Sequence, residues 1–366
     1  MISGDKNYNG VIDELVNGLW ISPSDNQQYG IPIKNIEIRE TLDGKESDLI
    51  KDLHSNQKLL VVSDPFTHKA MGSRIFKNLK GNINVDEFVW EQPSSSIKGV
   101  EFLRSKLQDY DGMIAVGSGT VSDSIKYATF LEGKVYSVFA TTPMNAYTTG
   151  TASISFDGVK KSLVAHYAQG VFFDLEVLSN CPKRLTAAAF ADVICRTTAQ
   201  VDWLMSHKLL NTDYKTTPYE LLALYEMDMI NNASDIAAGK IDSLALLTLI
   251  SAIMGLGTSF TQTTHVGSMG EHGISHYIDM FAGDMHPGTS HGEQVGIATI
   301  SISKFQNAIL KKDQPPIITP TNIPEDAKLD SNFYKDALKY GRFIRDRYTI
   351  LDLAGDSNQL DSLINV

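Results

Sequence analysis

The first half of the chain alternates short apolar runs with amphipathic stretches. Apolar runs of strand length occur at 36–40, 58–64, 85–90, 112–117, 135–140 and 170–175. Helical periodicity fills several of the intervals between them, at 44–55, 67–81, 96–108 and 121–133. Strands that alternate with helices of this length predict a parallel sheet with helices on both faces.

The pattern changes near Pro182. Helical segments are expected beyond it, at 183–210, 217–238, 241–258 and 292–311, and no strand is predicted there. The sequence therefore predicts an α/β domain over residues 1–180 and an all-helical domain over residues 181–366. Two domains of this kind commonly leave a cleft for a ligand. The most apolar run, at 244–257, is shorter than the roughly 20 residues of a membrane span and is expected to form a buried helix.

Composition narrows the class of protein and its partners. Of 366 residues, 42% are hydrophobic and 20% charged, which is typical of an ordinary globular protein. The net charge of −11 argues against nucleic acid and an anionic membrane as partners. Cys181 and Cys195 are the only cysteines, too few for a disulfide framework, and the polar N-terminal stretch lacks the apolar core of a signal peptide. A cytoplasmic location is expected.

A glycine-containing loop follows the apolar run at 112–117. The sequence GSGTVSD occupies 117–123 and leads into a predicted helix. Gly117 and Gly119 are expected to allow a tight turn and a close approach to a ligand, and a helix N-terminus suits a pyrophosphate. Thr120 and Ser122 offer hydroxyl donors. Because Ser122 replaces the third glycine of a GxGxxG fingerprint, an ordinary strand-to-helix turn is the alternative.

Five of the nine histidines lie within 27 positions, at His265, His272, His276, His286 and His291. His272 and His276 are four residues apart, so on a helix they share one face. They could ligate one metal, although a helical pair of histidines is also common in cores and on surfaces. His291 lies 19 residues after His272 and opens another predicted helix. His265 and His286 lie in loops, where exposure to solvent is expected.

A catalytic zinc usually has three protein ligands and an open position, and one ligand is often a carboxylate. Asp192 is the candidate, because it interrupts the apolar, alanine-rich segment AAAFADVICRTTAQVDW. A carboxylate in such a segment is unfavourable unless it is paired or bound to a metal. An ion pair with Arg196, one turn later, is the alternative role for Asp192, and the sequence does not decide between the two.

Five segments together carry a resemblance to a known family. They are GSGTVSDSIKYA, ATTPMNAYTTGTASIS, AAAFADVICRTTAQVDW, GEHGISH and SHGEQVGIAT. They resemble the iron-containing alcohol dehydrogenase and dehydroquinate synthase superfamily, and within it the sn-glycerol-1-phosphate dehydrogenases. The resemblance extends from about residue 36 to about residue 311. It implies a dehydroquinate synthase-like fold, in which a Rossmann-like α/β domain precedes an all-α domain.

The resemblance also implies roles for particular residues. The three ligands of a divalent metal are Asp192, His272 and His291. The substrate is bound by Asn145, Asp192 and His276. Of these, His276 is the catalytic residue beside the substrate and is not a metal ligand. The resemblance therefore argues against His272 and His276 as a pair of ligands to one metal. The dinucleotide is bound by Asp64, Gly117, Ser118, Gly119, Thr120, Val121, Thr141, Thr142 and Thr149. An N-cap of the next helix is the alternative role for Asp64.

One segment departs from the family. The family typically has Pro-Ser-Met-Asp-Gly-Tyr where this chain has TPMNAY at 142–147. Asn145 therefore stands where an aspartate contacts the substrate hydroxyls, and it keeps an acceptor but loses the charge. Ala146 in place of glycine also restricts the local backbone. The departure affects the identity of the substrate more than the type of reaction.

The reaction that the resemblance implies is the reversible NADH- or NADPH-dependent reduction of dihydroxyacetone phosphate to sn-glycerol 1-phosphate. The metal acts as a Lewis acid on the ketone, and the cofactor delivers hydride. Zn²⁺ is expected, with Ni²⁺ and Fe²⁺ as alternatives, because all three accept imidazole and carboxylate ligands. Asp64 favours NAD over NADP, since a carboxylate repels a 2′-phosphate. A homodimer is expected from the resemblance and from the frequency of two-fold assemblies.

Three other functions stay open. A glycerol, polyol or other alcohol dehydrogenase would keep metal and cofactor but need no phosphate-binding residues, and the sequence identifies none. A dehydroquinate synthase-like lyase shares the HGE element, but the Asp192 ligand and Gln294 count against it. A non-catalytic nucleotide-binding relative would be expected to lose metal ligands early, whereas all three are present.

Overall fold

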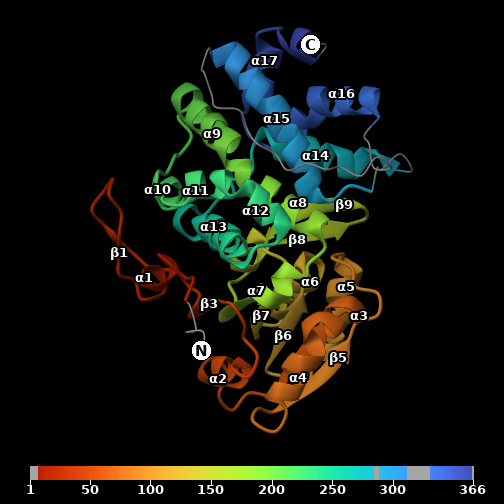
Figure 1. The fold of residues 1–366 in the computed structure, drawn as a ribbon. Helices are drawn as coiled ribbons and strands as arrows, with labels where there is room; N and C mark the ends of the chain where they lie inside the picture. Colours follow the sequence, from red (N-terminus) through yellow and green to blue (C-terminus); the bar gives the residue numbers. More distant parts are fainter. Residues whose placement is uncertain (1–6, 284–287, 311–329, 365–366) are drawn as a thin grey trace. The chain divides into compact units, whose positions relative to one another are not determined.

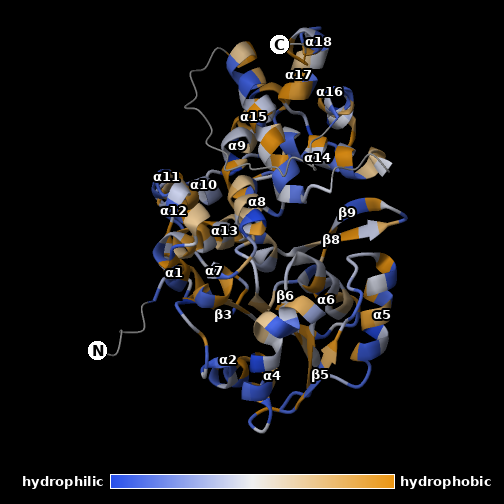
Figure 2. Cartoon of the chain, turned by 45° about the vertical axis from the view of Figure 1, so that its right-hand side comes forward, coloured by the Kyte–Doolittle hydropathy of each residue, from blue (hydrophilic) through white to orange (hydrophobic). Residues whose placement is uncertain are grey.

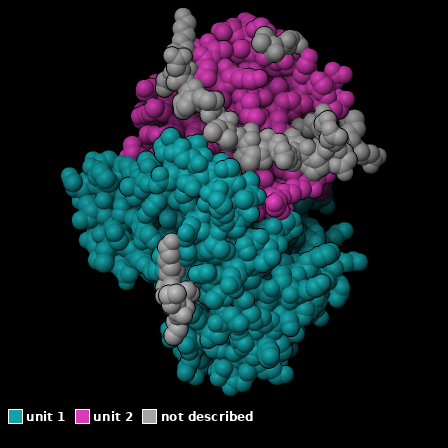
Figure 3. Space-filling view, in the orientation of Figure 1, with its two compact units in different colours: residues 1–157, 161–182, 220–259 teal, residues 158–160, 183–219, 260–366 magenta. Residues whose placement is uncertain are grey.

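The computed structural model describes residues 7–283, 288–310 and 330–364 (Figure 1). The chain forms two compact units, which Figure 3 colours separately. Unit 1 contains residues 1–157, 161–182 and 220–259, and unit 2 contains residues 158–160, 183–219 and 260–366. His286 lies outside the described residues.

Six strands of unit 1 form one parallel sheet in the order β3-β10-β7-β6-β4-β5. Their bounds are β3 Asn35–Arg39, β4 Leu59–Ser63, β5 Val85–Val89, β6 Gly112–Gly117, β7 Val135–Ala140 and β10 Gly170–Asp174. These are the six strands predicted from the sequence, to within one residue at each end. Every residue of β4, β6 and β10 is buried, which is typical of a parallel sheet covered on both faces.

Helices between the strands cover the sheet. They are α2 Glu46–Leu53, α3 Pro65–Thr67, η1 His68–Gly72, α4 Ser73–Leu79, α5 Ile97–Leu107, α6 Gly119–Leu131 and α7 Leu175–Ser179. On one face Ile114 and Phe139 pack with Ile50 of α2 and Ile75 of α4. Helix α6 packs on β6 and β7 and against α5, and right-handed crossovers place these two helices on the opposite face. In Figure 2 the strands are mainly hydrophobic, whereas α5 alternates between hydrophobic and hydrophilic residues.

A hairpin and a short N-terminal pair of strands were not predicted. The elements outside the large sheet are α1 Ile12–Val16, β1 Trp20–Ile21, β2 Gln28–Tyr29, η2 Asn145–Thr148, β8 Thr151–Phe156 and β9 Val159–Val164. The turn between β8 and β9 has positive φ at Asp157 (50°) and Gly158 (86°). A two-residue Asp-Gly turn of this kind is a strong hairpin signal, so the sequence did contain a sign of this hairpin.

The division of the helices between the units differs from the predicted boundary. Helices α11 Glu226–Asn231 and α12 Ala233–Ala238, with most of α13 Ile241–Thr261, belong to unit 1. The predicted helical segment at 217–238 is three short helices, of which α10 Thr217–Ala223 is the first. Helix α13 packs closely on η2, since a Cβ at Gly255 would lie 2.3 Å from the carbonyl oxygen of Asn145. Contacts of this kind attach α13 to the sheet unit.

Helix α13 is long and apolar enough to cross a membrane by composition and length. It is the one such helix within the described residues, and most of it is buried. The prediction of a buried helix at 244–257 therefore agrees with its surroundings, since burial of this extent is typical of a core helix.

Unit 2 is a set of packed helices. They are α8 Lys183–Ile194, α9 Arg196–Leu210, α14 Gly270–Phe281, α15 His291–Leu310, α16 Ser331–Tyr340, η5 Gly341–Phe343, α17 Ile350–Asp356 and α18 Leu360–Ile364, and the division between the units falls within α10. Its core joins Ile274, Ile302, Phe305 and Leu351. Helices α8 and α15 cross at very short range, because a Cβ at Gly292 would lie 2.2 Å from the carbonyl oxygen of Ala188. The alanine-rich sequence of α8 and Gly292 permit this approach, which brings Asp192 of α8 towards the start of α15.

Candidate functional site

The three predicted metal ligands meet in unit 2. Asp192 comes from the last turn of α8, His272 from the first turn of α14, and His291 is the first residue of α15. One ligand atom of each lies within 4.8 Å of the other two. The Nε2 atoms of His272 and His291 are 3.5 Å and 4.0 Å from Asp192 Oδ1. One carboxylate and two imidazoles that converge in this way fit the donor set of a divalent transition metal with an open coordination position.

The tautomer of His272 is set by an anionic neighbour. His272 Nδ1 lies 3.1 Å from Glu271 Oε1, and that oxygen also accepts the Met269 N–H at 2.6 Å. Burial acts to raise the pKa of Glu271, but the hydrogen bonds from His272 and Met269 hold it below its usual value, so the carboxylate is ionised. An ionised carboxylate only accepts, so His272 Nδ1 carries the proton. The lone pair of Nε2 therefore points towards Asp192.

A neutral relay sets the tautomer of His291. Ser275 Oγ lies 2.9 Å from His291 Nδ1 and donates to Gln294 Oε1 at 2.7 Å. The orientation of the Gln294 amide follows from Asp279, whose carboxylate accepts from Gln294 Nε2 at 3.0 Å. Because the single hydroxyl proton of Ser275 goes to Gln294, Ser275 accepts from His291 Nδ1–H. His291 Nε2 therefore has its lone pair on the side of Asp192.

The sequence reasoning missed both positioning groups. Glu271 stands beside the ligand in GEH, and Ser275 lies one turn further along the same helix. Both are fully buried. Metal-ligating histidines almost always donate a hydrogen bond from their second ring nitrogen. Polar side chains close to a predicted ligand in the sequence are therefore candidates for the acceptor.

His276 lies beside the three predicted ligands. Its ring centroid is 5.9 Å from that of His291, at an interplanar angle of 66°. Burial, together with the positive charge of Arg345, lowers the pKa of His276 to about 3. The imidazole is therefore neutral at physiological pH and offers one donor and one acceptor.

Cys195 forms a second group with Glu271 and His272, whose ligand atoms also lie within 4.8 Å of one another. Burial, with the charges of Glu271 and Asp192, raises the pKa of the Cys195 thiol well above its ordinary value. The thiol donates to the carbonyl oxygens of Asp192 and Gly267, at 2.9 Å and 3.2 Å. The group that contains Asp192 is the one that joins all three predicted ligands.

Arg196, the alternative partner considered for Asp192, has contacts of its own. Its Nη1 donates to Gln200 Oε1 at 2.7 Å, and its guanidinium lies 5.9 Å from the ring centroid of Tyr219. Burial lowers the pKa of Arg196 to about 10. These contacts give the Arg196 side chain a role in the packing of α9 against Tyr219.

The predicted glycine loop lies at the carboxyl end of β6 and the N-terminus of α6. Gly117 ends β6, Ser118 is the N-cap and Gly119 begins the helix. Neither glycine has a positive φ, so the turn here does not depend on a left-handed backbone conformation. A Cβ at Gly117 would lie 2.8 Å from Cβ of Val121, whereas the nearest atom to a Cβ at Gly119 is 4.0 Å away. Gly117 therefore allows close packing of strand on helix, whereas a Cβ at Gly119 would meet only the end of the Met144 side chain, at van der Waals distance.

The second predicted cofactor stretch is tied to this loop. The Thr141 N–H donates to the carbonyl oxygen of Gly117 at 3.3 Å. Thr142 Oγ1 and the Tyr147 hydroxyl share a hydrogen bond of 2.6 Å, and Tyr147 also donates to the carbonyl oxygen of Gly117 at 3.1 Å. Asn145 begins η2 in the same stretch. The structure thus holds 141–147 and the glycine loop together in unit 1.

A buried lysine supports the same region and was not singled out from the sequence. Lys126 Nζ donates to Asp123 Oδ1 (3.2 Å), Ala146 O (2.6 Å), Thr149 Oγ1 (3.1 Å) and Thr151 O (2.9 Å). The side chain is fully buried, and burial lowers its pKa against the opposing effect of Asp123. Lys126 therefore fixes the loop that carries Thr149 to α6.

Asp64 lies at the carboxyl end of β4 and caps α3. Its Oδ1 accepts from the N–H groups of Phe66 and Thr67, at 2.8 Å and 3.0 Å. The alternative role weighed for Asp64, a helix N-cap, is therefore present. In the described part of the chain its Oδ2 makes no hydrogen bond, so the same carboxylate keeps an acceptor for a ribose hydroxyl.

His265 is partly buried and not exposed as expected. Its ring centroid lies 5.5 Å from that of Trp203, and it is hydrogen-bonded to Thr263. Burial, with the positive charges of Arg347 and Arg345, lowers its pKa to about 4.

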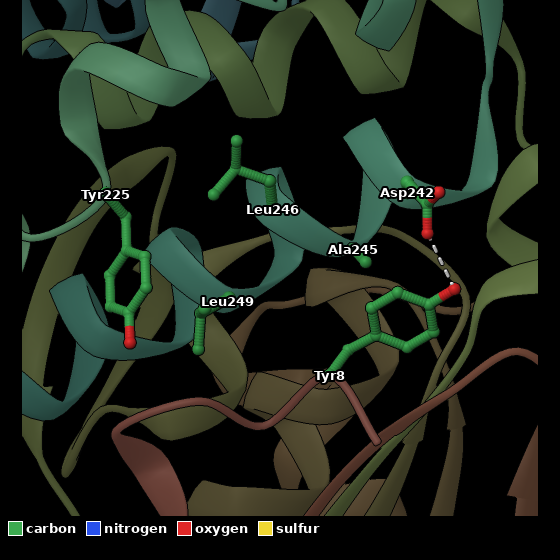
Figure 4. A pocket seen from close by; sticks show the side chains of 6 residues that line it. All are labelled: Tyr8, Tyr225, Asp242, Ala245, Leu246 and Leu249. Atoms are coloured by element: carbon green, nitrogen blue, oxygen red, sulfur yellow. Dashed lines mark hydrogen bonds between the residues drawn. The ribbon is translucent and has the colours of Figure 1, made fainter. Parts of the chain in front are cut away.

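A separate hollow of about 270 Å³ lies in unit 1, beside α13 (Figure 4). It is lined by Tyr8, Tyr225, Asp242, Ala245, Leu246 and Leu249. The Tyr8 hydroxyl donates to Asp242 Oδ1 at 2.9 Å, as the dashed line in Figure 4 marks. None of these six residues is a predicted site residue, and none carries a positive charge.

The chain is similar to known proteins of one enzyme family. Residues 37–182 match the family model described as iron-containing alcohol dehydrogenase. The chain is 30% identical over 328 residues to glycerol-1-phosphate dehydrogenase [NAD(P)+] of Pyrococcus horikoshii, with 87% of this chain and 93% of the relative covered. It is 30% identical over 311 residues to the protein of the same name from Methanothermobacter thermautotrophicus, with 83% and 87% covered.

The fold is also similar to a solved structure. A probable glycerol dehydrogenase from Sinorhizobium meliloti superposes with a TM-score of 0.65 at 16% sequence identity, over 88% of this chain and 95% of that chain. At this identity the likeness concerns the fold, an α/β part with a parallel sheet and a helical part.

Proposed function

The chain belongs to the glycerol-1-phosphate dehydrogenase family of iron-containing alcohol dehydrogenases, and we propose that it reduces dihydroxyacetone phosphate to sn-glycerol 1-phosphate with NADH or NADPH. The reaction is reversible and acts on a CH–OH group. The observation that carries the proposal is the convergence of Asp192, His272 and His291, with both Nε2 lone pairs directed by hydrogen bonds at Nδ1.

The three residues would hold one divalent metal, for which Zn²⁺ is our first choice and Ni²⁺ or Fe²⁺ the alternatives. When bound, such an ion supplies a Lewis acid that polarises a ketone. His276, whose ring lies beside that of His291, would hydrogen-bond the substrate, accepting a proton at one ring nitrogen and donating one from the other.

The dinucleotide would lie along the residues of unit 1 predicted for it. The N–H groups of Gly119, Thr120 and Val121 open α6, and a helix N-terminus suits a pyrophosphate. The Oδ2 atom of Asp64 is available to a ribose hydroxyl, which favours NAD over NADP. Thr141, Thr142 and Thr149 are the further proposed cofactor neighbours. A cytoplasmic location and a homodimer complete the proposal.

An alcohol or polyol dehydrogenase is the second candidate, favoured by Asn145. This residue stands at the start of η2 where the family pattern has an aspartate. An amide binds hydroxyls less strongly than a carboxylate does, so the substrate range is the part of the proposal most open to test.

The test is the oxidation of NADH and NADPH by Zn²⁺-loaded protein, with dihydroxyacetone phosphate and dihydroxyacetone offered separately, before and after treatment with a chelator. We expect chelator-sensitive turnover of the phosphorylated ketone. Turnover of dihydroxyacetone alone would move the protein to the polyol dehydrogenases. Absence of turnover of both, with metal and cofactor bound, would refute an oxidoreductase of this type.

A further inference from the structure

Two arginines of unit 2 lie on the loop between η5 and α17. Arg345 Nη1 donates to Ser268 Oγ at 2.5 Å. Arg347 Nη2 donates to Thr264 Oγ1 at 2.6 Å, and its Nη1 donates to the carbonyl oxygen of Ser268. Both guanidinium groups therefore converge on the turn that leads into α14, four residues before His272.

We propose that Arg345 and Arg347 form an oxyanion subsite that binds the phosphate group of the substrate. The proposal rests on the function proposed above and names the residues that distinguish a phosphorylated from an unphosphorylated ketone. Guanidinium groups suit this task because their planar fork matches the oxygens of a phosphate.

The guanidinium groups of Arg345 and Arg347 have few hydrogen-bond partners. Over residues 7–283, 288–310 and 330–364, no carboxylate forms an ion pair with either guanidinium. Arg345 uses one donor and Arg347 two in the hydrogen bonds described, whereas each group has five donors. Both side chains are only partly exposed. Two like charges in such surroundings repel each other, and an anion that accepts from both would relieve the repulsion.

The surroundings of Arg347 disfavour its positive charge. Burial, with the positive charge of Arg345, lowers the pKa of Arg347 to about 9. The charge of Glu271 acts in the opposite direction, but that carboxylate is engaged by His272 and Met269. A phosphate would therefore meet two protonated guanidinium groups at neutral pH that lack a direct counter-ion.

The fold brings the segment that carries the two arginines against the helix of His272. Helix α14 and η5 are in backbone contact, because a Cβ at Gly273 would lie 2.7 Å from the carbonyl oxygen of Gly341. Gly273 follows His272 directly, and Gly341 begins the segment that ends at Arg345 and Arg347. In dihydroxyacetone phosphate only one carbon and the ester oxygen separate the ketone carbon from phosphorus. A ketone near His272 therefore brings its phosphate into the neighbourhood of this turn.

A purely structural role for the two arginines makes different predictions. In that case they only hold the turn at 264–268, and their removal would weaken metal binding and the turnover of every substrate alike. A subsite for phosphate acts on phosphorylated ligands only.

The experiment uses the full chain loaded with Zn²⁺ and NADH, in the variants R345Q, R345K and R347Q. Arg342 supplies the matched control R342Q, since it lies in the same segment but stacks on Phe343 and lies 4.0 Å from Asp356. The first readout is the ratio of kcat/KM for dihydroxyacetone phosphate to that for dihydroxyacetone. The second is the rise in Tm that inorganic phosphate produces, with chloride at equal ionic strength as the reference.

We expect R345Q and R347Q each to lower the ratio about 10- to 100-fold, through a higher KM for the phosphorylated ketone. A change of this size corresponds to the loss of one charged hydrogen bond. R345K should recover part of the ratio, and R342Q should keep all of it. Inorganic phosphate should raise the Tm of the wild type and R342Q but not of R347Q. An unchanged ratio in both glutamine variants, or equal Tm shifts in wild type and variants, would overturn the subsite.

The two proposals fail separately. If the wild type turns over neither ketone, the proposed reaction fails, and the Tm shift with inorganic phosphate still decides the subsite. If it turns over dihydroxyacetone phosphate and R345Q and R347Q do so with an unaltered KM, the reaction stands and the subsite is lost.

Discussion

Replacement of Glu271 by glutamine isolates the charge behind one metal ligand. In E271Q the amide oxygen can still accept from His272 Nδ1–H and from the Met269 N–H, as Glu271 Oε1 does now. The amide nitrogen would then face Thr198 Oγ1, which lies 3.3 Å from Glu271 Oε2 and donates to the carbonyl oxygen of Cys195. That hydroxyl can accept from the amide. The variant therefore keeps the shape and the hydrogen bonds and loses the negative charge.

The expected magnitude follows from the role of such carboxylates. A carboxylate behind a ligating histidine raises the basicity of the ligand, and its loss typically weakens metal binding about 10- to 100-fold. At about 1.4 kcal/mol per tenfold change, this corresponds to about 1.4 to 2.8 kcal/mol. Because Glu271 is fully buried and ionised, solvent screens its charge little, and we expect the upper half of that range.

The assay is competition for Zn²⁺ with a chromophoric chelator, at equilibrium, for the wild type, E271Q and S275A. S275A is the matched variant on the other ligand, since it removes a neutral partner of His291. We expect E271Q to weaken Zn²⁺ binding more than S275A does, while kcat at saturating Zn²⁺ changes less than the affinity. Equal affinities for the wild type and E271Q, with unchanged Tm of the metal-free proteins, would refute the electrostatic role of Glu271.

Three further outcomes test other parts of the structure. N145D should raise kcat/KM for the phosphorylated ketone if an aspartate at this position contacts the substrate hydroxyls, and a loss of activity would show that the amide suits this enzyme's substrate. G292A should lower the unfolding free energy in urea by about 1–3 kcal/mol, because its Cβ would lie 2.2 Å from the carbonyl oxygen of Ala188; an unchanged midpoint would contradict the close crossing of α8 and α15. Burial lowers the pKa of His166 from 6.5 to about 4, so the unfolded chain binds more protons between these values and the unfolding free energy falls as the pH drops from 6.5 to 4. H166Q should show a shallower fall in urea titrations at pH 7 and pH 4.5, and an identical fall would remove His166 as a contributor.

The sheet could be predicted because its strands satisfy local rules. Leu59–Ser63 and Gly112–Gly117 are buried along their whole length, and an apolar run of that length between helical stretches is typical of a central strand. The β8-β9 hairpin was missed although Asp157 and Gly158 signal it, because it forms a two-stranded sheet separate from the parallel sheet. Helix α13 was recognised as buried, but periodicity does not say which partner buries a helix that is apolar all round.

The sequence predicted the ligand residues of the candidate site, but not the hydrogen-bond partners and backbone contacts that hold them in position. The resemblance supplied Asp192, His272 and His291, whereas the spacing of 19 residues between the histidines leaves their separation in space undetermined. Their meeting depends on backbone contacts at Gly292, and the sequence does not show which carbonyl group a glycine faces. Glu271 could have been predicted from the sequence, because it directly precedes the ligand His272. The two subsite arginines lie far along the chain from the histidines, so only the packing of η5 on α14 reveals them.

The charges of unit 2 give these supports a common purpose. A divalent ion beside Asp192 and Glu271 meets two negative charges, so the metal site is close to neutral when it is filled. A phosphate dianion that arrives next to it would then be unbalanced and, in partly buried surroundings, strongly disfavoured. Arg345 and Arg347 supply the missing two positive charges, and no described carboxylate pairs with them. The negative charges of Asp192 and Glu271 therefore compensate the metal, and the positive charges of Arg345 and Arg347 compensate the phosphate.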